Sequence, residues 1–255
     1  MKIINLCSGS KGNSNYIEIN NIKILIDAGK NYRYLKESLA SKNIDIADLN
    51  YVFITHNHSD HVTALINVLK NTKANFIVPE KLYNSLKDKD KIIAPVFFDN
   101  DYLIGDIKIT ALKSSHDAPD SRNYVIDYLD KKISIITDTG YINQKHFKFY
   151  YNSDVIFMES NHDIEKLQNG RYPDYLKKRI LSDEGHLSNN QAGFYLTKLI
   201  GDKTKNILLI HLSEENNSPE KAINTVSYIL KDYKISIPNI NYAKQIEISE
   251  VILDD

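Results

Sequence analysis

The sequence predicts an α/β protein in which helices pack on the outside of β-sheets. Its apolar runs form two strand-rich blocks, and each block is followed by segments with helical spacing. A sandwich of the α/β or α+β kind buries both types of element. No internal repeat, low-complexity tract or linker divides the sequence, so we expect a single domain over residues 1–255.

The composition places few limits on the substrate. The chain of 255 residues is 42% hydrophobic and 25% charged, which is typical of a globular protein with a substantial core. Its 32 basic and 33 acidic residues give a net charge of −1, so no global basic field marks it as a nucleic-acid-binding protein. A nucleic-acid substrate would have to be held by a local patch.

Cys7 is the only cysteine, which excludes an intramolecular disulfide and a CxxC zinc site. The apolar run after Met1 is too short for a signal peptide. No stretch approaches the roughly 20 apolar residues of a membrane-spanning helix. We therefore expect a cytoplasmic protein with no membrane partner.

The first block contains a Gly/Ser-rich turn, Ser8 to Ser14, after the first strand. The next two apolar runs flank Asn20-Asn21, which indicates a hairpin with a short turn that ends at Asp27. Strands are expected over residues 2–7, 16–19, 22–26 and 51–55, and helices over residues 32–39 and 62–69.

The second half of the chain is richer in helices. Ser218 before Pro219 is typical of a helix start, and Gly201 is expected to end the helix before it. Further strands are expected over residues 75–78, 92–98, 102–104, 107–112, 124–129, 132–137, 155–158, 207–210 and 246–253. Further helices are expected over residues 80–87, 141–151, 173–181, 188–200 and 219–230.

The most unusual stretch is His56-Asn57-His58-Ser59-Asp60-His61, which lies between an expected strand and an expected helix. Three imidazoles and a carboxylate in six positions carry a large desolvation cost unless they are paired or bound to metal. No fold needs such a cluster for packing. The cluster therefore predicts a functional site.

Three more potential metal ligands follow apolar strands, namely His116, Asp138 and His211. If these strands are neighbours, their ends meet at one edge of a sheet, where α/β proteins commonly build sites. The seven donors are too many for one tetrahedral ion and suit two. Imidazole with carboxylate favours Zn²⁺, Mn²⁺ or Fe²⁺ over Ca²⁺ or Mg²⁺. His146 has no such partner, and we expect it on the surface.

The pattern of these seven donors along the chain resembles the metallo-β-lactamase superfamily. The resemblance implies a four-layer αβ/βα sandwich with a dinuclear site at one edge. It implies that one ion is held by His56, His58 and His116. It assigns Asp60, His61 and His211 to the second ion, and Asp138 to a bridge between the two.

Further motifs resemble the YycJ (WalJ) group of this superfamily. Members of that group are regarded as 5′-to-3′ exonucleases on DNA, with a suggested role in mismatch repair. The segments that carry the resemblance are Ser8 to Asn13, Ser115 to Ala118, Glu159 to Asp163, Gly185 to Asn189 and His211 to Asn217.

Glu159 and His186 resemble the acidic residue and the additional histidine that RNase Z and related nucleases place beside the metals. An imidazolium held by a carboxylate can stabilise a charged phosphorane and a leaving alkoxide. The alternatives are structural. His186 would be a turn or helix-capping residue, and Glu159 would cap the helix that follows it.

Other candidate residues have a functional and a structural interpretation. Asp27 either orients a ligand imidazole or occupies a turn. Asn13 belongs to a loop that either offers N–H groups to phosphate or is an ordinary turn. His162 is either a substrate contact or a surface residue at a helix start. A phosphate-binding rim or a solvated helical face is formed by Lys145, Lys148, Arg171, Lys177, Lys178 and Arg179 with Phe147, Tyr150, Tyr172 and Tyr175.

We therefore expect a dinuclear metal-dependent phosphodiesterase that is a 5′-to-3′ DNA exonuclease with a possible role in DNA repair. A hydroxide bridging two ions would attack phosphorus in line, with Asp60, Glu159 and His186 serving catalysis. The rival interpretations are a glyoxalase II-like thioester or lactone hydrolase, an RNA nuclease on the same scaffold, and a metal-stabilised regulatory protein. The complete donor set disfavours the last of these.

Overall fold

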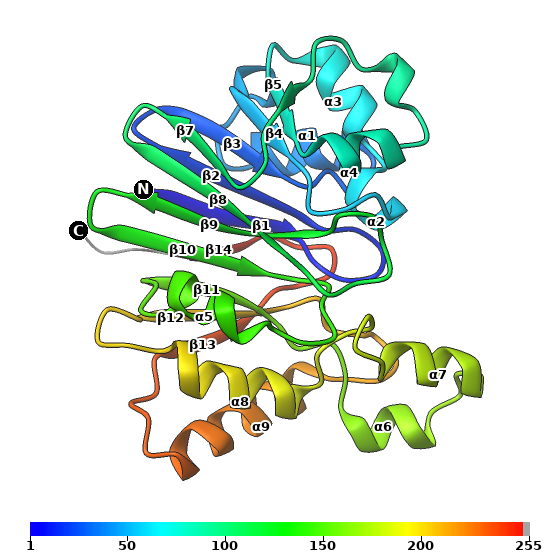
Figure 1. The fold of residues 1–255 in the computed structure, drawn as a ribbon, viewed down its shortest axis with the longest axis vertical. Coiled ribbons are helices and arrows are strands. Elements are labelled where there is room, and N and C mark those ends of the chain that lie inside the picture. Colours follow the sequence, from blue (N-terminus) through cyan, green and yellow to red (C-terminus); the bar gives the residue numbers. More distant parts are fainter. Residues whose placement is uncertain (252–255) are drawn as a thin grey trace. The chain divides into compact units, whose positions relative to one another are not determined.

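The computed structural model describes residues 1–251 and contains two seven-stranded sheets (Figure 1). Its backbone forms two compact units. The first unit comprises Met1–Tyr102, Ala118–Arg122 and the C-terminal segment from Lys244. The second comprises Leu103–Asp117 and Asn123–Ala243, so each unit is assembled from separate pieces of the chain.

The sheet of the first unit has the strand order β14-β1-β2-β3-β4-β5-β6. Asn20 and Asn21 have φ values of 48° and 65° and form the two-residue turn between β2 and β3, as expected for a hairpin. From β3 to β6 the strands are parallel, so their carboxyl ends share one edge. The strands are β1 Lys2–Cys7, β2 Ser14–Ile19, β3 Ile22–Ile26, β4 Tyr51–Phe53, β5 Asn75–Val78, β6 Val96–Phe97 and β14 Ser249–Val251.

Helices cover one face of this sheet. Leu35 of the first helix and Val68 of the third are buried against Val52 of β4, in a continuous apolar core. The helices contribute apolar residues at helical spacing, and the strands contribute every second residue, which points to the same face of the sheet. The helices are α1 Tyr32–Ala40, α2 Ser59–Val62, α3 Leu65–Asn71 and α4 Glu80–Ser85, with 3₁₀ turns at Ile46–Asp48 and Lys89–Lys91.

The sheet of the second unit has the order β13-β12-β11-β10-β9-β8-β7. Its strands β10 to β13 run parallel, so their carboxyl ends again share an edge. The strands are β7 Asp101–Ile104, β8 Ile107–Lys113, β9 Arg122–Tyr128, β10 Lys131–Ile136, β11 Val155–Glu159, β12 Asn206–Ile210 and β13 Asn239–Tyr242.

Two long helices, α8 (Asn189–Leu199) and α9 (Pro219–Asp232), pack side by side on this second sheet (Figure 1). Leu196 and Val226 from these helices share a core with Ile156 of β11. Three shorter helices are α5 Phe147–Tyr150, α6 Ile164–Asn169 and α7 Asp174–Ile180, with a 3₁₀ turn at Gln144–His146. None of the helices within residues 1–251 has the length and apolar character needed to cross a membrane.

Some predicted elements differ from the structure. The strand expected over residues 92–98 shrinks to Val96–Phe97, because Pro95 lacks an N–H group and Ile93 is exposed to solvent. The helix expected over residues 141–151 begins only near Gln144, because the Asn143 side chain caps the chain there. The strand expected over residues 246–253 is formed at Ser249–Val251, and residues 252–253 lie outside the described part.

Two further differences have simple causes. β13 was missed because its residues, Asn-Ile-Asn-Tyr, are half polar, as suits an edge strand with two exposed positions. Gly201 does not end α8 in a left-handed conformation. A Cβ at this position would lie 2.5 Å from the Asn152 side chain, so the glycine permits a close approach.

Ser218→Ala is expected to lower the free energy of unfolding by about 1 kcal/mol, because Ser218 Oγ accepts the Lys221 N–H at the start of α9. Ser227→Ala, inside the same helix, is the matched control and should change stability by less than about 0.5 kcal/mol. Urea denaturation followed by circular dichroism measures both variants. An equal loss in the two would contradict the capping role.

Candidate metal centre

In the first unit, the parallel strands β3 and β4 deliver polar residues to the same edge of the sheet. Asp27 follows β3 directly, and Thr55 and His56 follow β4 after one apolar residue. Asp27 has a φ of 65°, in the left-handed region that residues other than glycine rarely adopt. The chain therefore turns sharply at the end of β3, and the Asp27 carboxylate lies against Thr55.

The buried Asp27 carboxylate fixes the position of His61. It accepts the Thr55 N–H at 2.7 Å and the Thr55 hydroxyl at 2.9 Å, and it lies 2.8 Å from His61 Nδ1. A carboxylate only accepts hydrogen bonds, so we assign the His61 proton to Nδ1. His61 Nε2 then carries the lone pair, which is the form that ligand histidines usually present to a metal.

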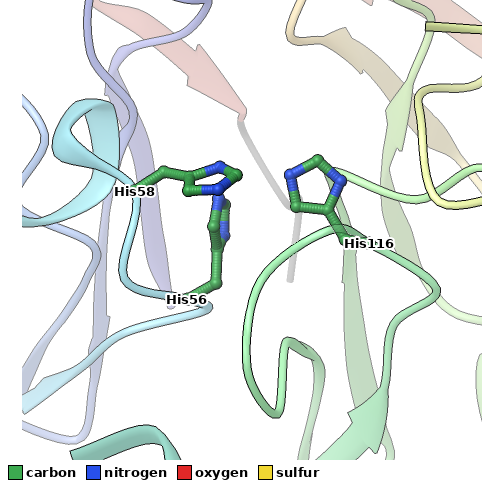
Figure 2. Close-up of side chains that lie close together, drawn as sticks. All are labelled: His56, His58 and His116. Atoms are coloured by element: carbon green, nitrogen blue, oxygen red, sulfur yellow. The ribbon is translucent and has the colours of Figure 1, made fainter. Parts of the chain in front are cut away.

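The three imidazoles of the cluster are packed against one another. The ring centroids of His56 and His58 are 4.6 Å apart, and those of His56 and His61 are 4.0 Å apart. Figure 2 shows the rings of His56 and His58 next to one another at the loop before α2, and the His116 ring on the loop after β8. Rings this close bring several imidazole nitrogens together, as a site for a transition metal requires.

Asn13 lies against the same cluster. Its Nδ2 atom is 3.2 Å from Asp60 Oδ2 and 3.0 Å from His61 Nε2, and its backbone N–H donates to the Asp60 carbonyl at 2.8 Å. Gly29 also packs against this carbonyl, because any residue with a Cβ atom at position 29 would place that atom 1.6 Å from the Asp60 oxygen. The loop that holds Asn13 therefore packs tightly on the start of α2.

In the second unit, His116, Asp138 and His211 follow β8, β10 and β12. Asp138 and His211 have φ values of 45° and 56°, so the chain again turns sharply where the donors lie. Asp138 Oδ1 is 3.5 Å from His211 Nε2 and 3.8 Å from His116 Nε2. These three predicted ligands of the second unit are thus brought together by their strands.

His116 is oriented by the backbone. Its Nδ1 atom lies 3.2 Å from the Gly185 carbonyl, which can only accept, so Nδ1 carries the proton and Nε2 presents its lone pair. Burial lowers the pKa of His116, and the neighbouring Asp138 opposes that shift. His116 is therefore neutral at pH 7, which is the form that binds a metal.

Glu159 and His186 form a close pair in the second unit. Glu159 ends β11 and is fully buried, and its Oε1 atom lies 2.6 Å from His186 Nδ1. The His186 ring is stacked on that of His211, with centroids 5.1 Å apart. Ligand atoms from Asp138, Glu159, His186 and His211 all lie within 4.8 Å of one another.

The electrostatics of the pair favour an ionised carboxylate. Burial alone raises the pKa of the Glu159 carboxyl, but the charge and hydrogen bond of His186 outweigh burial and hold the pKa below its ordinary value. Its other oxygen accepts the Thr139 N–H at 2.8 Å. Ser188 caps α8 and Asp163 caps α6, so neither His186 nor Glu159 serves as a helix cap.

Side-chain amides join the motif segments around this pair. Asn189 and Asn217 donate to each other's carbonyl oxygens at 2.9 and 2.8 Å, and both are buried. Asn217 also donates to the Ser160 and Asn161 carbonyls, and Asn161 donates to the His211 carbonyl. The network fixes the backbone on which His186 and His211 are mounted.

Two histidines differ from expectation. His162 is fully buried, so its interpretation as a surface residue is wrong. Burial lowers its pKa to about 4, and Glu159 and His186 lie near enough for their charges to act on that pKa. His146 is half-buried rather than exposed, because the turn that carries it precedes the core helix α5. Tyr150 of that helix is buried in the core, which removes it from the predicted basic rim.

Thr55 was missed by the sequence analysis. Its hydroxyl lies 3.0 Å from Nδ1 of both His56 and His61 and also contacts Asp27. The only signal was a hydroxyl residue directly before the cluster, at the end of an apolar strand. Threonine is so common in strands that this signal is weak.

The donor chemistry of both sets suits divalent transition metals. Each set combines buried imidazoles, some with one nitrogen held by a protein acceptor, with carboxylates. Oxygen-rich sites for Ca²⁺ or Mg²⁺ have a different composition. The residues present therefore fit the ions that this combination of ligands usually holds.

Comparison with known proteins agrees with this chemistry. Residues 23–212 match the family model described as Beta-lactamase superfamily domain. The chain belongs to the metallo-β-lactamase superfamily, and it is a hydrolase of that class. The predicted fold class is confirmed.

Within this superfamily, the chain is similar to several individual proteins. The chain is 36% identical over 225 residues to exodeoxyribonuclease WalJ of Streptococcus pneumoniae, covering 85% of this chain and 83% of that protein. It is 33% identical over 235 residues to exodeoxyribonuclease YycJ of Bacillus anthracis, covering 89% and 88%. The crystal structure of YhfI from Bacillus subtilis shares the fold, with a TM-score of 0.73 at 17% identity over 98% of this chain and 99% of that one.

Asp27→Asn is expected to weaken divalent-metal binding about 10- to 100-fold, because the neutral amide no longer holds the His61 tautomer as a carboxylate does. Competition with a metal-buffering chelator measures the affinity. Asp48→Asn is the control, since Asp48 pairs with Lys23 on an exposed surface. Equal affinities in wild type and Asp27→Asn would contradict the orienting role.

Proposed function

We propose that this hydrolase cleaves phosphodiester bonds in nucleic acid and acts as a 5′-to-3′ DNA exonuclease, with a role in DNA repair. The observation that carries the proposal is the Glu159–His186 pair beside Asp138 and His211. Two bacterial relatives that bear the name exodeoxyribonuclease support the choice of DNA over RNA.

We propose that the seven donors bind two divalent ions, Zn²⁺ or Mn²⁺ or alternatively Fe²⁺. Their division between the two ions rests on the family resemblance alone. When bound, such ions lower the pKa of water and neutralise the charge that develops on the phosphoryl oxygens.

In this proposal the His186 imidazole donates a proton or a hydrogen bond to the leaving oxygen of the phosphodiester. Nδ1 of His186 faces the Glu159 carboxylate, which accepts the Nδ1 proton and leaves Nε2 to act on the leaving oxygen. The His186 side chain is 15% exposed, whereas that of Glu159 is 0% exposed. A substrate can therefore reach the imidazole, while the carboxylate acts only through it.

This pair distinguishes the proposal from a glyoxalase II-like thioesterase. An alkoxide is a poor leaving group and needs a proton or a hydrogen bond as the P–O bond breaks. A thiolate leaves readily without one, because thiols are far more acidic than alcohols. A buried carboxylate dedicated to one exposed imidazole is thus better explained by phosphodiester cleavage.

Asp60→Ala and His61→Ala are each expected to abolish cleavage of end-labelled DNA while the circular dichroism spectrum stays that of the wild type. The assay uses single- and double-stranded DNA labelled at either end, RNA of the same sequence, a chromogenic phosphodiester and a thioester. DNA shortened from the 5′ end supports the proposal. Thioester turnover without phosphodiester turnover would replace it with the rival activity.

His186→Ala is expected to lower kcat on DNA by about 10²- to 10⁴-fold, with a smaller change in KM, because the imidazole acts as the bond breaks. His146→Ala is the matched control, since His146 lies in the same unit but has no contact with Glu159 or Asp138 among the hydrogen bonds and ion pairs of the described chain. An unchanged kcat in His186→Ala would return His186 to a structural role.

A further inference from the structure

The segment between Glu159 and His186 carries helices α6 and α7 and a local excess of positive charge. Residues 164–181 contain five basic and two acidic side chains, a net charge of +3, whereas the whole chain has −1. The basic residues are Lys166, Arg171, Lys177, Lys178 and Arg179. Such an excess on a short segment attracts a polyanion.

Two of these five cations are not engaged with the protein. Lys166 and Lys177 donate to the Asn217 and Gln168 carbonyls, and Arg179 pairs with Asp117. Arg171 and Lys178 are exposed, and within residues 1–251 they form neither an ion pair nor a side-chain hydrogen bond. Their charges are therefore available to an external anion.

An exposed aromatic ring lies beside Lys178. Tyr175 of α7 is 75% exposed and stands one helical turn before Lys178, so the two side chains share a face. An aromatic ring beside unengaged cations is the combination that binds single strands, because bases stack on the ring while the cations hold the phosphates.

The end of α7 is attached to the loop that bears His186. The His186 N–H donates to the Ile180 carbonyl at 3.0 Å, and a Cβ at Gly185 would lie 2.2 Å from that carbonyl oxygen. Arg179 pairs with Asp117, the residue after His116. Tyr175 is five residues before Ile180, about 7.5 Å along the axis of the same helix.

We propose that Arg171, Tyr175 and Lys178 form a docking surface for single-stranded nucleic acid on the segment that leads into the His186 loop. The base stacks on Tyr175, and Arg171 and Lys178 bind the flanking phosphates. The proposal rests on the proposed nuclease function and adds the strand contact to it. Lys145 and Lys148 are not part of this surface, because they lie at α5, apart from α6 and α7 (Figure 1).

The same unit offers a matched control. Tyr228 of α9 is 72% exposed, and Lys231 follows it at the same spacing of three residues. This second pair has the chemistry of Tyr175 and Lys178 but lies on a helix with no hydrogen bond to the His186 loop among the described residues. A non-specific effect of removing an exposed tyrosine and lysine would appear equally at both places.

The test measures steady-state cleavage of end-labelled single-stranded DNA by the metal-loaded enzyme. Tyr175→Ala is expected to raise KM about tenfold, from the loss of one stacked base. Arg171→Ala/Lys178→Ala should raise KM and reduce the slope of log(kcat/KM) against log salt by about 1.4, from two phosphates at about 0.7 each. Tyr228→Ala/Lys231→Ala should match the wild type in both measurements.

The outcomes separate the two proposals. If the wild type degrades DNA and the α7 variants behave like the α9 control, the docking surface is refuted and the nuclease function stands. A loss confined to kcat would also refute it, because it would mean that α7 only supports the His186 loop. If the wild type cleaves no nucleic acid, both proposals fall.

Discussion

The candidate site depends on sharp turns of the backbone at the ends of strands. Asp27 and His211 follow a strand directly, and Asp138 follows β10 after Thr137; each of the three has a positive φ that costs roughly 1–2 kcal/mol for a residue with a Cβ. Asparagine or glycine would adopt that conformation more cheaply. The chain therefore accepts strain where a carboxylate or an imidazole is needed at the edge of a sheet, and the packed strands behind each turn supply the rigidity that maintains it.

The polar residues behind the donors are as constrained as the donors themselves. Asp27 accepts hydrogen bonds from the N–H and the hydroxyl of Thr55 and one from His61, all without access to solvent. Glu159 is similarly enclosed between His186 and the backbone of Thr139. A buried carboxylate is tolerated only when its lone pairs are occupied, so each of these groups commits several neighbours to a single geometry.

The sequence was informative where chemistry is local and less so where it depends on distant contacts. The Asn20-Asn21 hairpin and the start of α9 at Ser218 follow from turn and cap preferences, and the structure contains both. The donors after β4, β8, β10 and β12 could be named because polar residues after apolar runs stand out. That Glu159 lies 2.6 Å from His186 could not be derived from spacing, because 27 residues and two helices separate them. The burial of His162 and the role of Thr55 likewise arise only when separate segments pack together.

The way in which the two ends of the α6–α7 segment are held affects how freely its sequence can change during evolution. Its entrance is held by the Asp163 N–H on the Asn216 carbonyl at 2.9 Å, and its exit by the His186 N–H on the Ile180 carbonyl. Both contacts are made by backbone atoms, which any amino acid can supply, except that proline lacks the N–H. The stretch between them can therefore change its length and side chains while Glu159 and His186 keep their relation. Under the proposed function, contacts to the polymer and the chemistry of cleavage would be encoded by separate parts of one continuous segment.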